Sequence, residues 1–214
     1  MSEPLRRLPV YILIDCSGGM HGEPIEAVRR GLRALVEDFQ SDPQALELLY
    51  LSVITFAGSA VQACPLRQLA VFQTPNLIAG GPRALGEALD LLGQCIDLEV
   101  RKPEKDQKGD WKALVILLLY GIPQDDWVGA LARYKEATAK RVGSFIAIGC
   151  GSDVDLAMLE EITPSVVLLK RVTPDWFRSF GLHWSISPPW PMVGQIHDGP
   201  GLHLAQPQGV SSVP

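Results

Sequence analysis

The sequence lacks long apolar runs and clustered positive charge, and each absence excludes a class of protein. Its longest apolar runs fall far short of the ~20 residues that a membrane-spanning helix needs. No apolar stretch follows the arginines near the start, so no signal peptide is predicted. The net charge is −5 and no run of Lys or Arg is longer than a pair. We therefore expect neither a membrane nor a nucleic-acid partner.

The sequence also lacks paired cysteines. None of its four cysteines belongs to a CxxC pair, which argues against a zinc knuckle or a redox motif. Cys16 and Cys150 end apolar runs, as small buried side chains do. With no secretory signal and no paired cysteines, we expect a reducing, cytoplasmic location.

What the sequence does have is an alternation of apolar runs and helical periodicity. Of the 214 residues, 47% are hydrophobic and 20% charged, which is typical of a folded domain. Apolar runs predict strands over 10–14, 49–56, 113–119, 145–148 and 166–169. Such runs, alternating with amphipathic helices, predict a parallel sheet covered on both faces. The segment Ser59–Cys64 is expected to return as an edge strand. The predicted fold class is therefore α/β and Rossmann-like, with a mostly parallel central sheet, one antiparallel edge strand and helices on both faces.

Helices and the domain limits follow from the same reading. Helical spacing predicts helices over 25–39, 85–96, 125–142, 153–162 and 174–180. The polar stretch 99–112 is expected to be an exposed connection. After Gly181 the sequence becomes rich in Pro, Gly and Ser. We predict a domain over 8–187 and a tail over 188–214, with 194–214 mobile unless something holds it.

The most informative stretch is 9–24, PVYILIDCSGGMHGEP. A buried strand stops at Asp15, a small-residue loop containing Ser17 follows, and a helix then begins. A carboxylate and a hydroxyl thus stand together at the carboxyl end of a strand. In open α/β sheets this edge is where ligands and metals bind.

Four landmarks of the sequence, taken in order, are similar to those of the von Willebrand factor type A domains, and in particular to their tellurium-resistance (TerY-like) branch. The stretch 15–20 resembles the first metal-loop motif, Asp-x-Ser-x-Ser, and 22–27 resembles the helix start of this branch. The stretch 80–89 resembles a Gly-Gly-Thr loop with its helix, and 117–127 a fourth strand end. The resemblance covers roughly residues 8 to 187.

Family members with an active site bind Mg²⁺ or Mn²⁺ through two serines, a threonine and two aspartates. In this chain Asp15 and Ser17 match the first Asp and the first Ser. The other three positions have lost their ligand: Gly19 stands for the second Ser, Pro82 or Arg83 for the Thr, and Tyr120 for the second Asp. Because Mg²⁺ demands near-octahedral oxygen coordination, we expect a vestigial site with no metal and no other cofactor.

The resemblance then favours a non-catalytic adaptor that binds other proteins through its loops and tail. Its candidate contact residues are Met20, His21, Arg83, Tyr120, Trp184 and Trp190. A structural alternative remains for two residues: Asp15 accepts hydrogen bonds from its own loop, and Tyr120 fills the vacated cavity. The TerY-like branch implies a place beside a Ser/Thr kinase and a phosphatase in a bacterial stress or tellurite-resistance system.

Two other functions stay open at this point. One is a metal-dependent adhesion module in which Asp15 and Ser17, with waters, hold Mg²⁺ or Mn²⁺ and an acidic residue of the partner completes the shell. The other is a hydrolase with Ser17 as nucleophile, although the loop lacks the Gly-x-Ser-x-Gly elbow.

Overall fold

Seven strands form one sheet in the computed structural model, which describes residues 6–105, 108–174 and 202–203. Across the sheet the strands lie in the order β3-β2-β1-β4-β5-β6-β7. The strands are β1 (Leu8–Asp15), β2 (Leu49–Phe56), β3 (Ala60–Gln68), β4 (Ala113–Tyr120), β5 (Val142–Cys150), β6 (Val166–Leu169) and β7 (Leu202–His203). The helices are α1 (Glu23–Gln40), α2 (Pro43–Leu48), α3 (Leu85–Glu99), α4 (Trp127–Thr138) and α5 (Leu156–Ile162), with short 3-10 turns η1 (Gly18–Met20) and η2 (Leu69–Val71).

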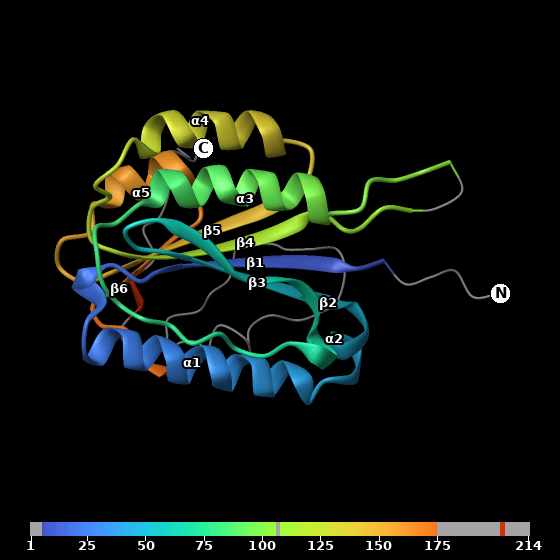
Figure 1. Ribbon diagram of the computed structural model, residues 1–214, viewed down its shortest axis with the longest axis horizontal. Coiled ribbons are helices and arrows are strands. Elements are labelled where there is room, and N and C mark those ends of the chain that lie inside the picture. Colours follow the sequence, from blue (N-terminus) through green and yellow to red (C-terminus); the bar gives the residue numbers. More distant parts are fainter. Residues whose placement is uncertain (1–5, 106–107, 175–201, 204–214) are drawn as a thin grey trace, which may run out of the picture.

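The predicted fold class is confirmed. Strands β2, β1, β4, β5 and β6 are mutually parallel, and β3 pairs with β2 as the expected antiparallel edge. Helices α1 and α2 cover one face, while α3, α4 and α5 cover the other (Figure 1). A further antiparallel strand, β7, pairs with β6 at the opposite edge. It lies in the segment 194–214, which we expected to be mobile unless something held it, and the pairing with β6 holds these two residues. The helix predicted over 174–180 lies almost wholly outside the described residues.

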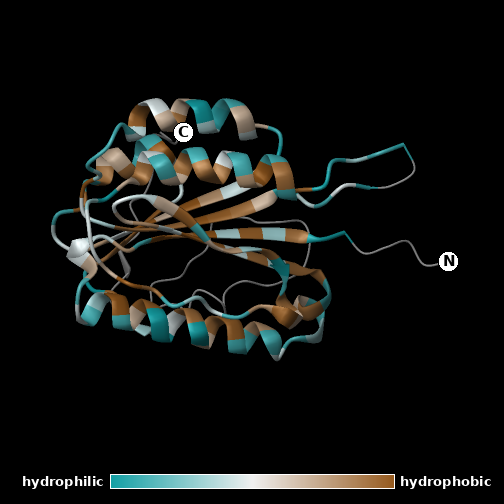
Figure 2. Cartoon of the chain, in the orientation of Figure 1, coloured by the Kyte–Doolittle hydropathy of each residue, from teal (hydrophilic) through white to brown (hydrophobic). Residues whose placement is uncertain are grey.

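The apolar side chains of the central strands divide between two cores. In β1, Val10 and Ile12 belong to the core beneath α1, whereas Tyr11 and Leu13 belong to the core beneath α3. Every residue of β1 is buried, which is why its sequence reads as a continuous apolar run. Figure 2 shows the brown strands enclosed by helices whose teal residues face outward. Among the described residues, no helix is long and apolar enough to cross a bilayer.

Helix boundaries follow local chemistry. Helix α1 begins after Gly22, whose φ of +81° suits glycine, and carries a proline in its first turn. Helix α2 was not predicted; Asp42 caps it by accepting a hydrogen bond from the Gln44 N–H. Helix α4 is shorter than predicted, because Asp126 caps its start and β5 already begins at Val142.

The edge strand β3 is partly closed by side chains from α3. The Ala60 N–H donates to Glu87 Oε2 over 3.1 Å, and the Leu66 N–H donates to Glu99 Oε1 over 3.1 Å. Pro65, within the same strand, has no N–H to donate. Several backbone donors that a free edge would expose are therefore absent or occupied.

The segment 99–112 is not wholly the exposed connection that we predicted. The Asp110 side chain is only 3% exposed and is held by Arg7, whose Nε donates to Oδ1 over 2.8 Å. Arg7 Nη2 donates to Asp110 Oδ2 and to the carbonyl of Glu99. Arg6 stacks over the Trp111 ring with 4.0 Å between the guanidinium carbon and the ring centroid. The prediction is wrong at Asp110 because a buried ion pair with the chain's start anchors this segment.

Candidate functional site

Asp15 lies at the carboxyl end of β1 and is fully buried. Its Oδ1 accepts a hydrogen bond from the Ser17 N–H over 2.7 Å, as expected for a residue that orders its own loop. Its Oδ2 accepts from the Tyr120 N–H over 2.9 Å and from Arg83 Nε over 2.6 Å. The carboxylate thus joins three segments that are far apart in sequence.

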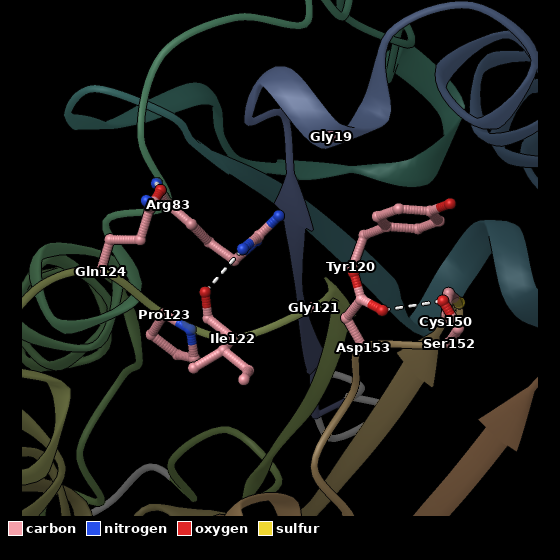
Figure 3. Close-up of a pocket in the computed structure, with 10 residues that line it drawn as sticks. All are labelled: Gly19, Arg83, Tyr120, Gly121, Ile122, Pro123, Gln124, Cys150, Ser152 and Asp153. Atoms are coloured by element: carbon pink, nitrogen blue, oxygen red, sulfur yellow. Dashed lines mark hydrogen bonds between the residues drawn. The ribbon is translucent and has the colours of Figure 1, made fainter.

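Arg83 reaches into the loop cluster from the segment before α3, and its side chain is 12% exposed. Besides its ion pair with Asp15, its Nη1 donates to the Ile122 carbonyl over 2.6 Å (Figure 3). Its main chain pairs with Gln124: the Arg83 N–H donates to Oε1 over 3.0 Å, and the Gln124 N–H donates to the Arg83 carbonyl over 2.9 Å. One side chain and its backbone therefore bind the end of β1 to the loop between β4 and α4.

Ser17 is 2% exposed, and its hydroxyl has no hydrogen-bond partner among the described residues. The loop around it is fixed by backbone bonds to the loop before α3. The Gly18 N–H donates to the Gly81 carbonyl over 2.9 Å, and the Gly80 N–H donates to the Cys16 carbonyl over 2.8 Å. Gly81 has a φ of +77°, and a Cβ there would lie 2.9 Å from the Gly58 nitrogen. These contacts hold the two loops in one arrangement.

A hollow of about 380 Å³ opens above these residues. Gly19, Arg83, Tyr120 and Ile122 line one part of it. Cys150 at the end of β5, with Ser152 and Asp153 after it, lines another (Figure 3). A Cβ at Gly19 would lie 3.0 Å from Arg83 Nη2 and 3.4 Å from Tyr120 Cδ1. The missing side chain at this position therefore leaves room for the guanidinium and the phenol ring.

Comparison with known families identifies this arrangement. The family model of the von Willebrand factor type A (VWA) domain matches residues 10–170. The chain belongs to the VWA family. The family is a general protein-interaction and adhesion module. No curated protein matches this VWA domain in sequence.

Solved structures agree with the VWA fold. A von Willebrand factor type A protein from Catenulispora acidiphila is 19% identical, with a TM-score of 0.61 over 82% of this chain and 42% of that one. Proximal thread matrix protein 1 from the mussel byssus is 18% identical, with a TM-score of 0.61 over 84% and 47%. The conserved hypothetical protein BatB from Bacteroides thetaiotaomicron is 17% identical, with a TM-score of 0.55 over 82% and 96%. This VWA domain thus spans less than half the length of the first two proteins. One structure of the mussel protein has zinc in its metal-ion-dependent adhesion site (MIDAS) motif.

The corresponding residues of this VWA domain do not fit a divalent cation. Asp15 matches the first family ligand, but its Oδ2 already forms an ion pair with Arg83 Nε over 2.6 Å. A dication about 4 Å from that guanidinium would meet roughly 8 kcal/mol of gross repulsion at an effective dielectric near 20. The unpartnered hydroxyl of Ser17, beside Asp15, is a feature that suits a cation. No group of three His, Cys, Asp or Glu residues within the described part of the chain could hold a metal.

The predicted contact residues divide into three groups. Arg83, Tyr120 and the exposed His21 lie at the carboxyl edge of the sheet, and Arg83 and Tyr120 line the hollow. Met20 does not line the hollow. The turn η1 directs its side chain into the core beneath α1, where it is 0% exposed. Its assignment as a contact residue is therefore wrong. Trp184 and Trp190 lie outside the described residues.

Sequence reasoning missed several residues of the hollow. Ile122 is 55% exposed at its border, and Ser152 and Asp153 follow the end of β5. The rule that ligands meet parallel strands at their carboxyl ends could have found the last two, since β5 was predicted as a neighbouring strand.

Two buried thiols lie near the Asp15 carboxylate, and one of them borders the hollow. Burial, and then the negative charge of Asp15, raises the pKa of Cys16 and of Cys150 to about 12. Both thiols are therefore protonated at neutral pH. Because the thiolate is the reactive form, burial disfavours nucleophilic chemistry at either thiol.

The same pKa shifts predict a loss of stability in alkali. An unfolded thiol releases its proton near pH 9, whereas Cys16 and Cys150 keep theirs in the folded protein up to about pH 12. Between these values the free energy of unfolding should fall by as much as about 1.4 kcal/mol per pH unit for each thiol. Urea denaturation at pH 8, 9 and 10 measures this slope. The Cys16→Ala/Cys150→Ala variant should reduce this slope, although Cys95, whose pKa burial raises to about 11, keeps part of it. A wild-type stability that stays constant over this range would contradict the prediction.

Proposed function

We propose that this VWA domain is a non-catalytic module that binds another protein through its loop face, defined as His21, Arg83, Tyr120, Ile122 and Asp153. The observation that carries the proposal is the hollow at the carboxyl edge of the sheet, bordered by the half-buried Tyr120 and the exposed Ile122. Tyr and Arg are enriched at the energetic centres of protein interfaces. Family membership supports the same function.

Nothing in the loop face supports catalysis. A serine nucleophile needs a base within hydrogen-bond reach, and the Ser17 hydroxyl has no partner of any kind among the described residues. That hydroxyl is also buried, so a substrate could not reach it without rearrangement. The thiol of Cys150 is held in its protonated form. The hydrolase alternative therefore has no support beyond the residue type of Ser17.

We further propose the setting in which the module works. It would join a Ser/Thr kinase and a phosphatase in a bacterial stress or tellurite-resistance system in the cytoplasm. The support is the resemblance of 22–27 and 117–127 to the TerY-like branch. In this setting the domain contributes no chemistry and brings partners together.

A metal-dependent adhesion module is the second candidate. The unpartnered hydroxyl of Ser17, next to Asp15, is the observation that favours it. The ion pair between Asp15 and Arg83 argues against it, because the carboxylate is already neutralised. We therefore favour binding without a metal.

A pull-down with matched variants tests the proposed function. The tagged full chain is incubated with a lysate of the bacterium that encodes it, and captured proteins are quantified by mass spectrometry. Ile122→Ser and Tyr120→Ala should each reduce capture of a specific partner at least tenfold, as expected where a central contact is lost. Leu98→Ser is the matched control. It changes an 84% exposed residue at the C-terminal end of α3, far from the loop face, and this variant should capture the partner as the wild type does.

The outcome separates the two candidates. Capture should be equal in EDTA and in Mg²⁺. Capture that disappears in EDTA would favour the adhesion module. Equal capture by wild type and both loop-face variants would contradict an interface at this hollow.

A further inference from the structure

We propose that the guanidinium of Arg83 is a built-in cation that replaces a divalent ion in this VWA domain, so that the loops are held together without any metal. The inference goes beyond the proposed function, because it concerns how the loop face is assembled. It holds whether or not a partner binds there, and its test uses different variants.

Arg83 contacts all three loops that meet at the carboxyl edge of the sheet. Through Nε it binds Asp15 at the end of β1, and through Nη1 it binds the Ile122 carbonyl after β4. Its own backbone lies in the segment before α3 and pairs with Gln124. Family members that hold a metal draw its ligands from the corresponding three loops. One arginine here makes the same connections, with oxygen atoms as its acceptors and a fixed positive charge at the centre.

Two glycines leave the space that the guanidinium occupies. A Cβ at Gly19 would lie 3.0 Å from Nη2, and a Cβ at Gly121 would lie 3.3 Å from Nη1. Gly121 also has a φ of +94°, which L side chains rarely adopt. The serine that the family pattern places at Gly19 would therefore crowd the arginine. Glycines at these positions and arginine at position 83 are mutually consistent.

The charge at the end of β1 is already balanced. Asp15 is fully buried and Arg83 nearly so, and together they are neutral. The second family aspartate is absent, since Tyr120 takes its position and offers only its backbone N–H to Asp15. A divalent ion would have to break the 2.6 Å pair and then lie beside the displaced guanidinium. The unpartnered hydroxyl of Ser17 is a neutral ligand, so neither it nor the waters that complete an octahedral shell would replace the lost negative charge.

The first measurement uses the wild-type chain. Its melting temperature is recorded in EDTA, in 5 mM Mg²⁺ and in 5 mM Mn²⁺. We expect no difference, because an ion that does not bind the folded state cannot stabilise it. An ion whose Kd is a hundredfold below its concentration would raise Tm by several degrees. Such a rise in the wild type would overturn the proposal.

The second measurement restores the family ligands. The variant Gly19→Ser/Arg83→Thr/Tyr120→Asp should bind Mn²⁺, seen as a rise in Tm of several degrees and as loss of the free-ion signal in electron paramagnetic resonance. Tyr120→Asp alone keeps Arg83 and should not bind, because the guanidinium still neutralises the site. Arg133→Thr removes an exposed arginine paired with Asp90 and is the control for loss of one positive charge.

Each outcome decides the proposal. Mn²⁺ binding by Tyr120→Asp as tight as by the triple variant would show that Arg83 is no barrier, and would overturn it. A triple variant that melts cooperatively but ignores Mn²⁺ would also overturn it, because Arg83 would not then stand in the place of an ion. If the triple variant does not fold, the wild-type measurement alone decides.

Discussion

Replacing Asp15 with Ala should lower the free energy of unfolding by about 3–5 kcal/mol, the range observed when one partner of a buried ion pair is removed. The change leaves the Arg83 guanidinium nearly buried and without its counter-charge. It also removes the acceptor from the N–H groups of Ser17 and Tyr120. The large effect arises because one carboxylate satisfies groups from three loops.

Urea denaturation monitored by circular dichroism measures this loss. Asp90→Ala, which breaks the exposed pair with Arg133, is the control and should leave the curve unchanged. Asp15→Ala/Arg83→Leu should recover part of the stability, since the orphaned charge is then gone. If Asp15→Ala unfolds at the wild-type urea concentration, Arg83 has found other partners and the account of the loop cluster is wrong.

Replacing Asp110 with Ala should be the second largest effect, with a loss of about 3 kcal/mol. Both carboxylate oxygens of Asp110 accept from Arg7, and Oδ2 also accepts from the Arg101 N–H. The Arg7 and Asp110 side chains are 13% and 3% exposed, so the pair is poorly solvated. Its removal would leave Arg7 with the Glu99 carbonyl as its main acceptor.

Two measurements check this prediction. Urea denaturation gives the loss of stability, and hydrogen exchange should show faster exchange in 99–112 and at the start of β1. Asp90→Ala, which breaks the exposed pair with Arg133 outside this segment, should alter neither result. Unchanged exchange in 99–112 would mean that this segment is held by contacts other than the Arg7 pair.

The central sheet could be predicted from the sequence because its strands are buried on both faces. The predicted bounds of β2 and β6 coincide with those observed, and β4 differs only by including Tyr120. Parallel strands of this kind have a local signature, a continuous apolar run. The same signature placed Asp15 and Tyr120 at strand ends, and the resemblance to the VWA motifs implied that both ends belong to one site. The location of the candidate site was therefore also predictable.

What could not be predicted depends on contacts between distant residues. The sequence put Arg83 in a loop, but it gave no indication that the side chain turns inward to Asp15, 68 residues earlier. The pairing of Asp110 with Arg7 spans 103 residues. A polar segment such as 99–112 is usually expected to be exposed, but this pairing buries the Asp110 side chain. Met20 follows two glycines, and only the folded turn shows that its side chain enters the core. Helix α2, with six residues, is too short for its periodicity to be recognised.

The edge of the sheet at β3, where side chains from α3 occupy backbone donors, disfavours self-assembly. A strand from a second molecule would lengthen the sheet beside β3 only by gaining backbone donors, but Ala60 and Leu66 already give theirs to Glu87 and Glu99. Pro65 offers none. Growth of ordered aggregates along this border is therefore disfavoured, since each added copy would first have to displace two carboxylates.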